Sequence, residues 1–202
     1  MAKIITVAHQ KGGVGKTTLV INLAYCFKDS LNVGLVDLDL QGSLLGLKST
    51  LTNLNIEQRP KNLQDIARLP YDLILADTPP YLSKDLPEIF LASDYILVPT
   101  KAGFLDVMAI KGTLQLVREA QKVKPQLKAG IVLNMIKLQT GLTGNIKEIL
   151  DSYELSVLET MITDRVSYTR SAILGGVVNM EDSRAKNEIL LLADEIFTEM
   201  GL

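Results

Sequence analysis

Two lysines and three glycines fall within six residues near the start of the chain. From residue 11 to residue 18 the segment reads Lys11-Gly12-Gly13-Val14-Gly15-Lys16-Thr17-Thr18. Glycines allow successive backbone N–H groups to turn inward and form a cradle that Cβ atoms would obstruct. The N–H groups that open the following helix face the same anion. The segment therefore predicts a phosphate-binding loop.

The side chains that follow the last glycine of this loop suit a nucleoside triphosphate. In phosphate loops of this type the lysine, here Lys16, reaches the β- and γ-phosphates, and the next hydroxyl, here Thr17, ligates Mg²⁺. Thr18 is then expected beside the α-phosphate. The front of the loop departs from the general pattern, because Gln10 stands at the glycine position and Lys11 adds a second cation.

Three aspartates follow apolar runs further along the chain. Asp37 and Asp39 end one such run, and Asp77 ends the next, directly before two prolines. Carboxylates at the carboxyl ends of parallel strands point into the ligand crevice. The segment that ends in Asp77 resembles a Walker B motif, and the resemblance implies that Asp77 holds Mg²⁺ through water, since Mg²⁺ keeps much of its hydration in proteins. Taken singly, Asp37 and Asp77 could instead be helix caps or turn residues.

The elements that position these residues follow from the pattern of apolar runs. Short runs rich in Val, Ile and Leu recur, and nearly continuous runs are typical of strands buried on both faces of a parallel sheet. The predicted strands are Lys3–Ala8, Asn32–Asp37, Tyr71–Asp77, Asp94–Pro99, Lys128–Met135 and Ser156–Thr160. Residues 48–62 are predicted to form a surface loop. Alternation of strands with helices implies a doubly wound, mostly parallel α/β fold, with one domain over residues 1–202.

Helical spacing of apolar residues marks the segments between the strands. One face after the phosphate loop consists of Leu19, Val20, Leu23, Ala24 and Phe27. A second predicted face consists of Leu105, Met108, Ala109, Gly112, Leu116 and Ala120. The last helix has the most regular face, with Ile189, Leu192, Ala193, Ile196, Phe197 and Met200. Asp182 or Ser183 is its predicted N-cap.

Composition excludes several classes of protein. The 202 residues contain one cysteine, Cys26, so neither a disulfide scaffold nor a cysteine-ligated cluster can form within one chain. No stretch approaches the roughly 18 consecutive apolar residues of a membrane span. The formal net charge of −2 argues against a protein that is basic over its whole surface, although it leaves room for a basic patch. We expect a cytoplasmic protein without a membrane partner.

The lysine at the front of the loop resembles the deviant Walker A motif of the ParA/MinD family of ATPases. The resemblance implies Mg²⁺ and ATP as ligands, and an ATP-dependent homodimer in which Lys11 contacts the phosphates bound by the partner subunit. The segment from Asp37 to Gly42 resembles the family's first switch, although Leu40 replaces a common proline. By resemblance, Asp39 positions or deprotonates the attacking water, and Asp37 supports the water shell of Mg²⁺. Asn134 takes the position that reads the adenine edge, unless it is a plain strand-end residue.

The resemblance covers nearly the whole chain and extends to partners. The short length is similar to that of small ParF-like plasmid partition ATPases, with no room for an N-terminal helix-turn-helix domain. In the family, the ATP dimer binds DNA without sequence preference, so we expect a nucleoid-associated protein. The candidate DNA contacts are Lys111, Lys137, Arg165, Arg170, Arg184 and Lys186, each of which could equally be an ordinary surface charge. A centromere-binding or cargo adaptor protein is expected to stimulate slow ATP hydrolysis.

Four other functions share parts of this pattern. A MinD-like membrane-cycling ATPase needs a basic amphipathic C-terminal helix, whereas residues 193–202 are acidic and lack Lys and Arg. A metabolic ligase with a phosphate loop has the fold but lacks the front lysine. A reductase that resembles the nitrogenase iron protein needs cluster cysteines that the chain does not have. A module that holds ATP without hydrolysing it remains open, although Asp39 favours turnover.

Overall fold

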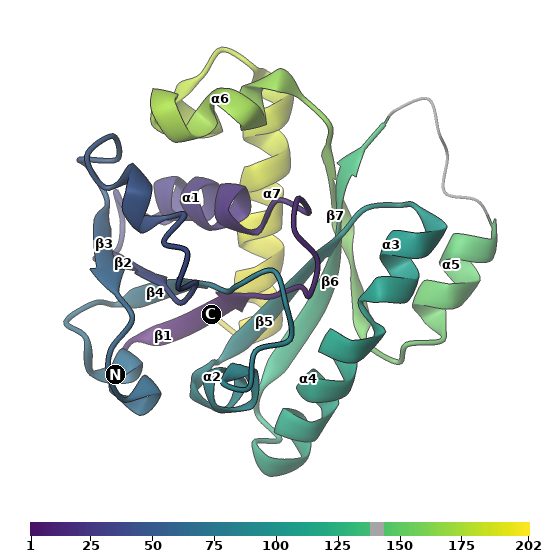
Figure 1. Cartoon of the computed structure of the whole chain (residues 1–202). Helices are drawn as coiled ribbons and strands as arrows, with labels where there is room; N and C mark the ends of the chain where they lie inside the picture. Colours follow the sequence, from purple (N-terminus) through teal and green to yellow (C-terminus); the bar gives the residue numbers. More distant parts are fainter. Residues whose placement is uncertain (138–143) are drawn as a thin grey trace.

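The computed structural model, which describes residues 1–137 and 144–202, is built on one sheet of seven parallel strands (Figure 1). The strand order is β3-β2-β4-β1-β5-β6-β7. The strands are β1 (Lys3–Val7), β2 (Val33–Asp37), β3 (Asn55–Gln58), β4 (Leu73–Asp77), β5 (Tyr95–Thr100), β6 (Lys128–Ile136) and β7 (Ser156–Thr163). Because all strands are parallel, their carboxyl ends meet at one edge of the sheet. β1 lies at the centre, where the chain order reverses and ligand crevices form.

Helices cover both faces of the sheet (Figure 1). One face packs against α1 (Lys16–Phe27), α6 (Val166–Leu174) and α7 (Ser183–Met200). The other packs against α2 (Leu86–Ala92), α3 (Phe104–Ala109), α4 (Lys111–Val123) and α5 (Gly144–Asp151). Three short 3₁₀ helices complete the described elements: η1 (Leu45–Leu47), η2 (Leu63–Arg68) and η3 (Val177–Asn179).

Alternate residues of each central strand enter opposite cores, which is why the strands read as continuous apolar runs. In β1, Ile5 and Val7 pack under α1, whereas Ile4 packs against the helices of the other face. β2 and β4 are buried at every position. The six predicted strands and the doubly wound parallel α/β fold are thereby confirmed.

The prediction that residues 48–62 form only a loop is wrong, because β3 lies within them. This edge strand pairs with β2 over Asn55–Gln58. Its sequence is mostly polar, and Ile56 is its one buried residue. A strand with one neighbour and one buried side chain has no apolar run, so periodicity cannot reveal it.

The predicted face of the helix after β5 is wrong at Leu105 and Met108 and correct at Ala120, which is buried. Leu105 and Met108 are 73% and 42% exposed. The side chains that pack against the sheet are Val107, Ile110, Leu114, Val117 and Ala120. These residues are also spaced three and four apart, so two sets of apolar residues in the same segment have helical spacing. The chain also breaks at Ile110 into α3 and α4, and a single helical wheel does not describe both.

The last helix is as predicted. Asp182 is the N-cap of α7, and its carboxylate accepts a hydrogen bond from the Ala185 N–H at 3.2 Å. The Phe197 ring stacks on Phe27 of α1, with 4.3 Å between the ring centroids. In the described residues, no helix has both the length and the apolar composition that a membrane crossing requires.

Candidate nucleotide-binding site

The phosphate loop connects the end of β1 to the start of α1 at the central crevice of the sheet. Gly13 and Gly15 have φ angles of +69° and +89°, which side chains on L-residues disfavour. A Cβ atom at Gly15 would also lie 2.4 Å from the Nδ2 atom of Asn134. Glycine at position 15 is therefore required both by the backbone and by the close approach of β6.

A cavity of about 320 Å³ opens above this loop. Its lining includes the predicted loop residues Gly12, Gly13, Gly15, Lys16, Thr17 and Thr18 together with Asp39. Ser43, Thr78, Pro80 and Met135, which the sequence analysis did not select, complete the wall. The segments that follow β1, β2 and β4 thus converge with the last residues of β6 on one space.

Lys16 presents a cation at the floor of this cavity. The residue is 7% exposed, and its Nζ donates a hydrogen bond to the Lys11 carbonyl at 3.1 Å. Burial lowers the pKa of Lys16, while the carboxylates of Asp77 and Asp39 act in the opposite direction. An ammonium group held by a neutral carbonyl keeps its charge available for an anion.

Thr17 and Asp77 form the part of the site suited to a metal ion. The Thr17 hydroxyl donates to Asp77 Oδ2 at 2.5 Å, and Asp77 is 1% exposed. The other oxygen, Oδ1, has no hydrogen-bond partner among the described residues although it is buried. Burial raises the pKa of Asp77 to about 7, while the Thr17 hydrogen bond and Lys16 lower it. A buried carboxylate oxygen without a partner beside a hydroxyl fits a hydrated Mg²⁺ ion.

Asp37 and Asp39 shape the segment that follows β2. Asp37 Oδ1 accepts a hydrogen bond from the Asp39 N–H at 3.0 Å, and Oδ2 accepts from the N–H groups of Leu44 and Leu45 at 2.9 and 2.8 Å. Asp39 itself lines the phosphate cavity, and its Oδ1 accepts from the Gln41 N–H at 3.0 Å. Asp37 therefore fixes the turn that places Asp39 in the cavity wall.

Lys11 bonds to α3 of its own chain. Its Nζ donates to the Leu105 carbonyl at 2.9 Å and lies 3.3 Å from Asp106 Oδ1, with its side chain 41% exposed. Lys11 does not line the phosphate cavity. The backbone N–H of Lys11 donates to Nδ1 of the buried His9 at 2.8 Å. Burial, followed by Lys16 and Lys11, lowers the pKa of His9 to about 4, so the imidazole is neutral and can accept this bond.

A second cavity of about 280 Å³ adjoins the first. Its lining residues are Thr18, Leu19, Asn134, Met135, Thr163, Asp164, Arg165, Tyr168 and Thr169. The Asn134 amide donates to the Val14 carbonyl at 2.7 Å, and its Oδ1 accepts from the Met135 N–H at 3.0 Å. Asn134 thus ties β6 to the phosphate loop from a place at the edge of the second cavity.

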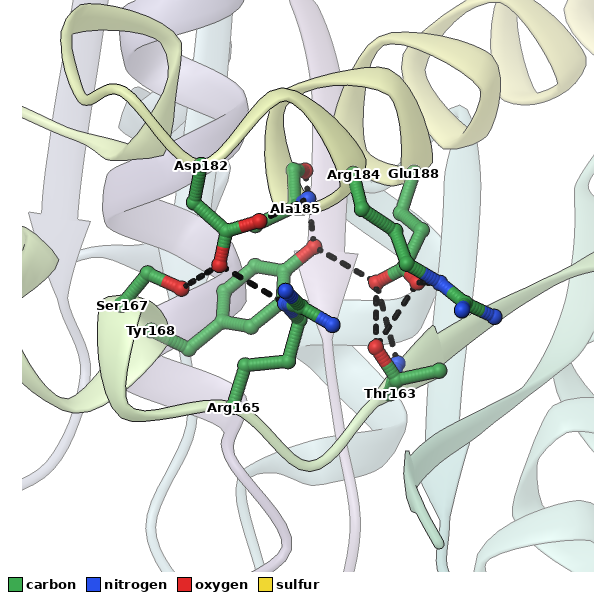
Figure 2. Close-up of polar contacts among 8 residues, drawn as sticks. All are labelled: Thr163, Arg165, Ser167, Tyr168, Asp182, Arg184, Ala185 and Glu188. Atoms are coloured by element: carbon green, nitrogen blue, oxygen red, sulfur yellow. Dashed lines mark hydrogen bonds and ion pairs between the residues drawn. The ribbon is translucent and has the colours of Figure 1, made fainter. Parts of the chain in front are cut away.

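The carboxylates of Glu188 in α7 and of Asp182, the N-cap of α7, bind residues that line the second cavity or lie next to them (Figure 2). Glu188 accepts hydrogen bonds from the Thr163 N–H at 3.0 Å and from the Thr163 hydroxyl at 2.7 Å. It also accepts from the Tyr168 hydroxyl at 3.3 Å. Asp182 accepts from Arg165 Nε at 2.7 Å and from the Ser167 hydroxyl. These bonds join α7 to the segment between β7 and α6, and the Arg165 guanidinium holds the pKa of Asp182 below its usual range.

The six candidate DNA contacts do not form one group. Arg165 and Arg184 belong to the network of Figure 2, since Arg184 Nε lies 3.2 Å from Glu188. Arg170 of α6 and Lys186 of α7 are exposed on the same side of the sheet. Lys111 begins α4 on the opposite face, and Lys137 follows β6. Neither the position of these residues in the sequence nor their charge indicates which of the six form ion pairs with carboxylates of the chain.

The geometry of this site agrees with comparisons to known proteins. A family model described as the CobQ/CobB/MinD/ParA nucleotide binding domain matches residues 5–188. The chain is 30% identical to the maintenance of carboxysome distribution protein A of Halothiobacillus neapolitanus over 183 residues, which cover 86% of this chain and 84% of the relative. It is 27% identical to the sporulation initiation inhibitor protein Soj of Bacillus subtilis over 97% of this chain and 98% of that protein.

Solved structures share the fold. The MinD cell division protein of Aquifex aeolicus superimposes with a TM-score of 0.75 over 98% of each chain, at 21% identity. Three observations agree on the family of this chain. They are the phosphate loop between the central strand and the first helix, the carboxylates at two neighbouring strand ends, and the match to the family model. The chain belongs to the CobQ/CobB/MinD/ParA nucleotide-binding domain family.

Proposed function

We propose that this ParA/MinD-type protein is an ATPase that partitions or positions a cargo in the cell. ATP closes a homodimer, the dimer binds DNA without sequence preference, and partner-stimulated hydrolysis to ADP and phosphate releases it. The observation that carries the proposal is the second lysine of the loop. Lys11 lies beside the phosphate cavity and is partly exposed, yet it does not line that cavity, so it can serve the site of a second subunit.

The chain's own residues supply the contacts for Mg·ATP. Lys16 and the backbone N–H groups of the loop would bind the β- and γ-phosphates. Thr17 and Asp77 would hold Mg²⁺, which would neutralise negative charge on the phosphates. Asp39 would orient the attacking water, because its carboxylate lines the phosphate cavity. A Lys11 amine from the partner subunit would stabilise charge that develops during phosphoryl transfer.

Exposed apolar side chains beside the cavity support the dimer. Leu40 is 78% exposed directly after Asp39, and Tyr81 is exposed directly after Pro80. Leu105, whose carbonyl binds Lys11, is exposed as well. Apolar surface around a charged site favours association with another protein surface. A second copy that brings Lys11 to the phosphates would cover these residues.

Arg170 and Lys186 are the stronger DNA candidates within the proposed set. Both are exposed, and neither has an ion pair with another described residue, whereas Arg165 and Arg184 are paired with Asp182 and Glu188. Lysine and arginine contacts to phosphates give sequence-independent affinity that falls steeply with salt. The dimer would then associate with the nucleoid in the cytoplasm.

The names of the relatives suggest the kind of cargo. One is a carboxysome distribution protein, and another, from Myxococcus xanthus, is a chromosome partitioning protein, so both a protein assembly and a chromosome are candidate cargoes. We propose that a centromere-binding or cargo adaptor protein stimulates hydrolysis here by ordering the segments after Asp39 and Asp77. A ligand shifts such an equilibrium only through its different affinity for the two states.

The test is gel filtration with Mg·ATP, with Mg·ADP and without nucleotide, each with and without random-sequence duplex DNA. The wild type is expected to dimerise and to bind DNA only with ATP. Lys11→Ala is expected to lose dimerisation and DNA binding while its affinity for ATP changes by less than about threefold. Lys61→Ala, which removes an exposed lysine elsewhere, serves as the matched control.

Three outcomes would contradict the proposal. Loss of ATP binding in monomeric Lys11→Ala would place this lysine in its own site. A wild type that stays monomeric with ATP and does not bind DNA would favour a metabolic ligase. A wild type that does not bind DNA but sediments with liposomes in the presence of ATP would favour a membrane-cycling ATPase.

A further inference from the structure

Met135 is one of two non-glycine residues with a positive φ in the described part of the chain, the other being Glu154. Its φ is +57°, a region that residues with a Cβ disfavour. The pairing of β6 with β7 shifts register between Leu133 and Ile136, the interval that contains Met135. A disfavoured backbone conformation persists only where its surroundings impose it, and such residues cluster at functional sites.

Met135 lies where the two cavities meet. Met135 and Thr18 are the two residues that line both the phosphate cavity and the second cavity. The Met135 Cε atom would lie 3.2 Å from a Cβ atom at Gly15, so the side chain lies against the phosphate loop. The side chain therefore stands at the passage between the two cavities.

A glycine at position 135 would give β6 the same conformation at lower cost, because glycine adopts positive φ freely. Because methionine at this position carries conformational strain that glycine would avoid, we expect its side chain to have a function. A thioether is polarizable and unbranched, and sulfur packs favourably against aromatic rings. Polar contact from the neighbouring Asn134 is limited, since its amide already bonds to Val14 and Met135.

We propose that Met135 positions the nucleoside, with its thioether packed against the nucleoside where it leaves the phosphate cavity. The proposal rests on the proposed function, because it takes the first cavity to hold the triphosphate. Met135 then contributes to the affinity for nucleotides and contributes nothing to the affinity for phosphates alone. It is a specificity residue for nucleotides over inorganic polyphosphate.

The test compares Met135→Gly with the wild type by calorimetric titration of Mg·ATP and of Mg·tripolyphosphate. The substitution removes the side chain and relieves the positive φ, whereas glycine gives the unfolded chain more freedom, so a melting curve first establishes that the variant is folded at the titration temperature. Its affinity for ATP is expected to fall about tenfold, while its affinity for tripolyphosphate changes by less than about twofold. Met135→Leu, which restores an apolar side chain, is expected to recover most of the ATP affinity.

Glu154→Gly is the matched control, because Glu154 also has a positive φ (+51°) and lines neither cavity at the nucleotide site. It is expected to bind ATP as the wild type does. The inference is overturned if Met135→Gly binds ATP with wild-type affinity, or if it loses ATP and tripolyphosphate equally. A wild type that binds no ATP would instead overturn the proposed function.

Discussion

The buried carboxyl of Asp77 sets part of the pH response of the nucleotide-free protein. Its pKa is raised by burial from 3.8 to about 7, so between these values the unfolded chain holds fewer protons than the folded one. Stability from this group is therefore fully present below pH 3.8 and is lost as the pH rises through 7. The lowered pKa of His9, about 4, acts in the opposite direction as the pH falls below 6.5.

Asp77→Asn removes the ionisation and leaves His9 unchanged. At pH 8 the variant is expected to gain on the order of 2 kcal/mol in free energy of unfolding, and at pH 4 to gain little. Urea denaturation at both pH values measures the difference. Asp29→Asn, at an exposed position, is the control. Equal gains at the two pH values would show that ionisation of Asp77 does not govern this response.

Residue types and spacing predicted most of the site. The loop residues, Asp39 and Asp77 lie where the sequence pattern indicated, because a strand–loop–helix segment and two strand ends are local features. Asp106 was missed because its partner Lys11 is 95 positions away. The conformation of Met135 was missed because nothing in the local sequence signals a positive φ at methionine.

At the scale of elements, α7 and β7 are joined by carboxylates as well as by apolar packing. Glu188 of α7 binds Thr163 at the end of β7, and Glu195 binds the N–H groups of Glu159 and Thr160 at 2.6 and 3.0 Å. β7 is an edge strand, so these side chains satisfy backbone groups that have only one neighbouring strand.

Glu188→Ala is expected to destabilise the protein by about 3 kcal/mol, because the buried N–H and hydroxyl of Thr163 lose their acceptor, whereas the Tyr168 hydroxyl keeps the Ala185 carbonyl. Asp194→Ala, on the exposed side of the same helix, is expected to change stability by less than about 0.5 kcal/mol. Chemical denaturation of both variants measures the contrast. Equal effects would mean that apolar packing alone joins α7 to β7.

Elements with strong apolar patterns were predicted from sequence, and those without them were not. The central strands and α7 are buried along continuous or regular stripes, so their patterns are unambiguous. β3 is too short and polar for such a pattern. The break at Ile110 was missed because the apolar spacing continues through it from Val107 to Ala120.

For the whole molecule, nucleotide binding should raise thermal stability. A ligand at about 100 times its Kd that binds only the folded state adds about 2.7 kcal/mol, which is roughly 5 to 10 °C for a chain of this size. Differential scanning fluorimetry with Mg·ATP measures this shift. Lys16→Ala should melt normally without ligand and show almost no shift. A full shift in that variant would exclude the loop as the binding site.

Parallel topology was predictable because right-handed crossover connections leave few alternatives once strands alternate with helices. The same topology separates the chain ends from the nucleotide. Met1 precedes β1, and α7 runs back so that Glu199 reaches Ser156 at the start of β7 (Figure 1). Both ends thus lie near the amino ends of the strands, roughly 15 Å or more from the phosphate loop. A fluorophore or affinity tag attached at either end would report on the protein without obstructing ATP.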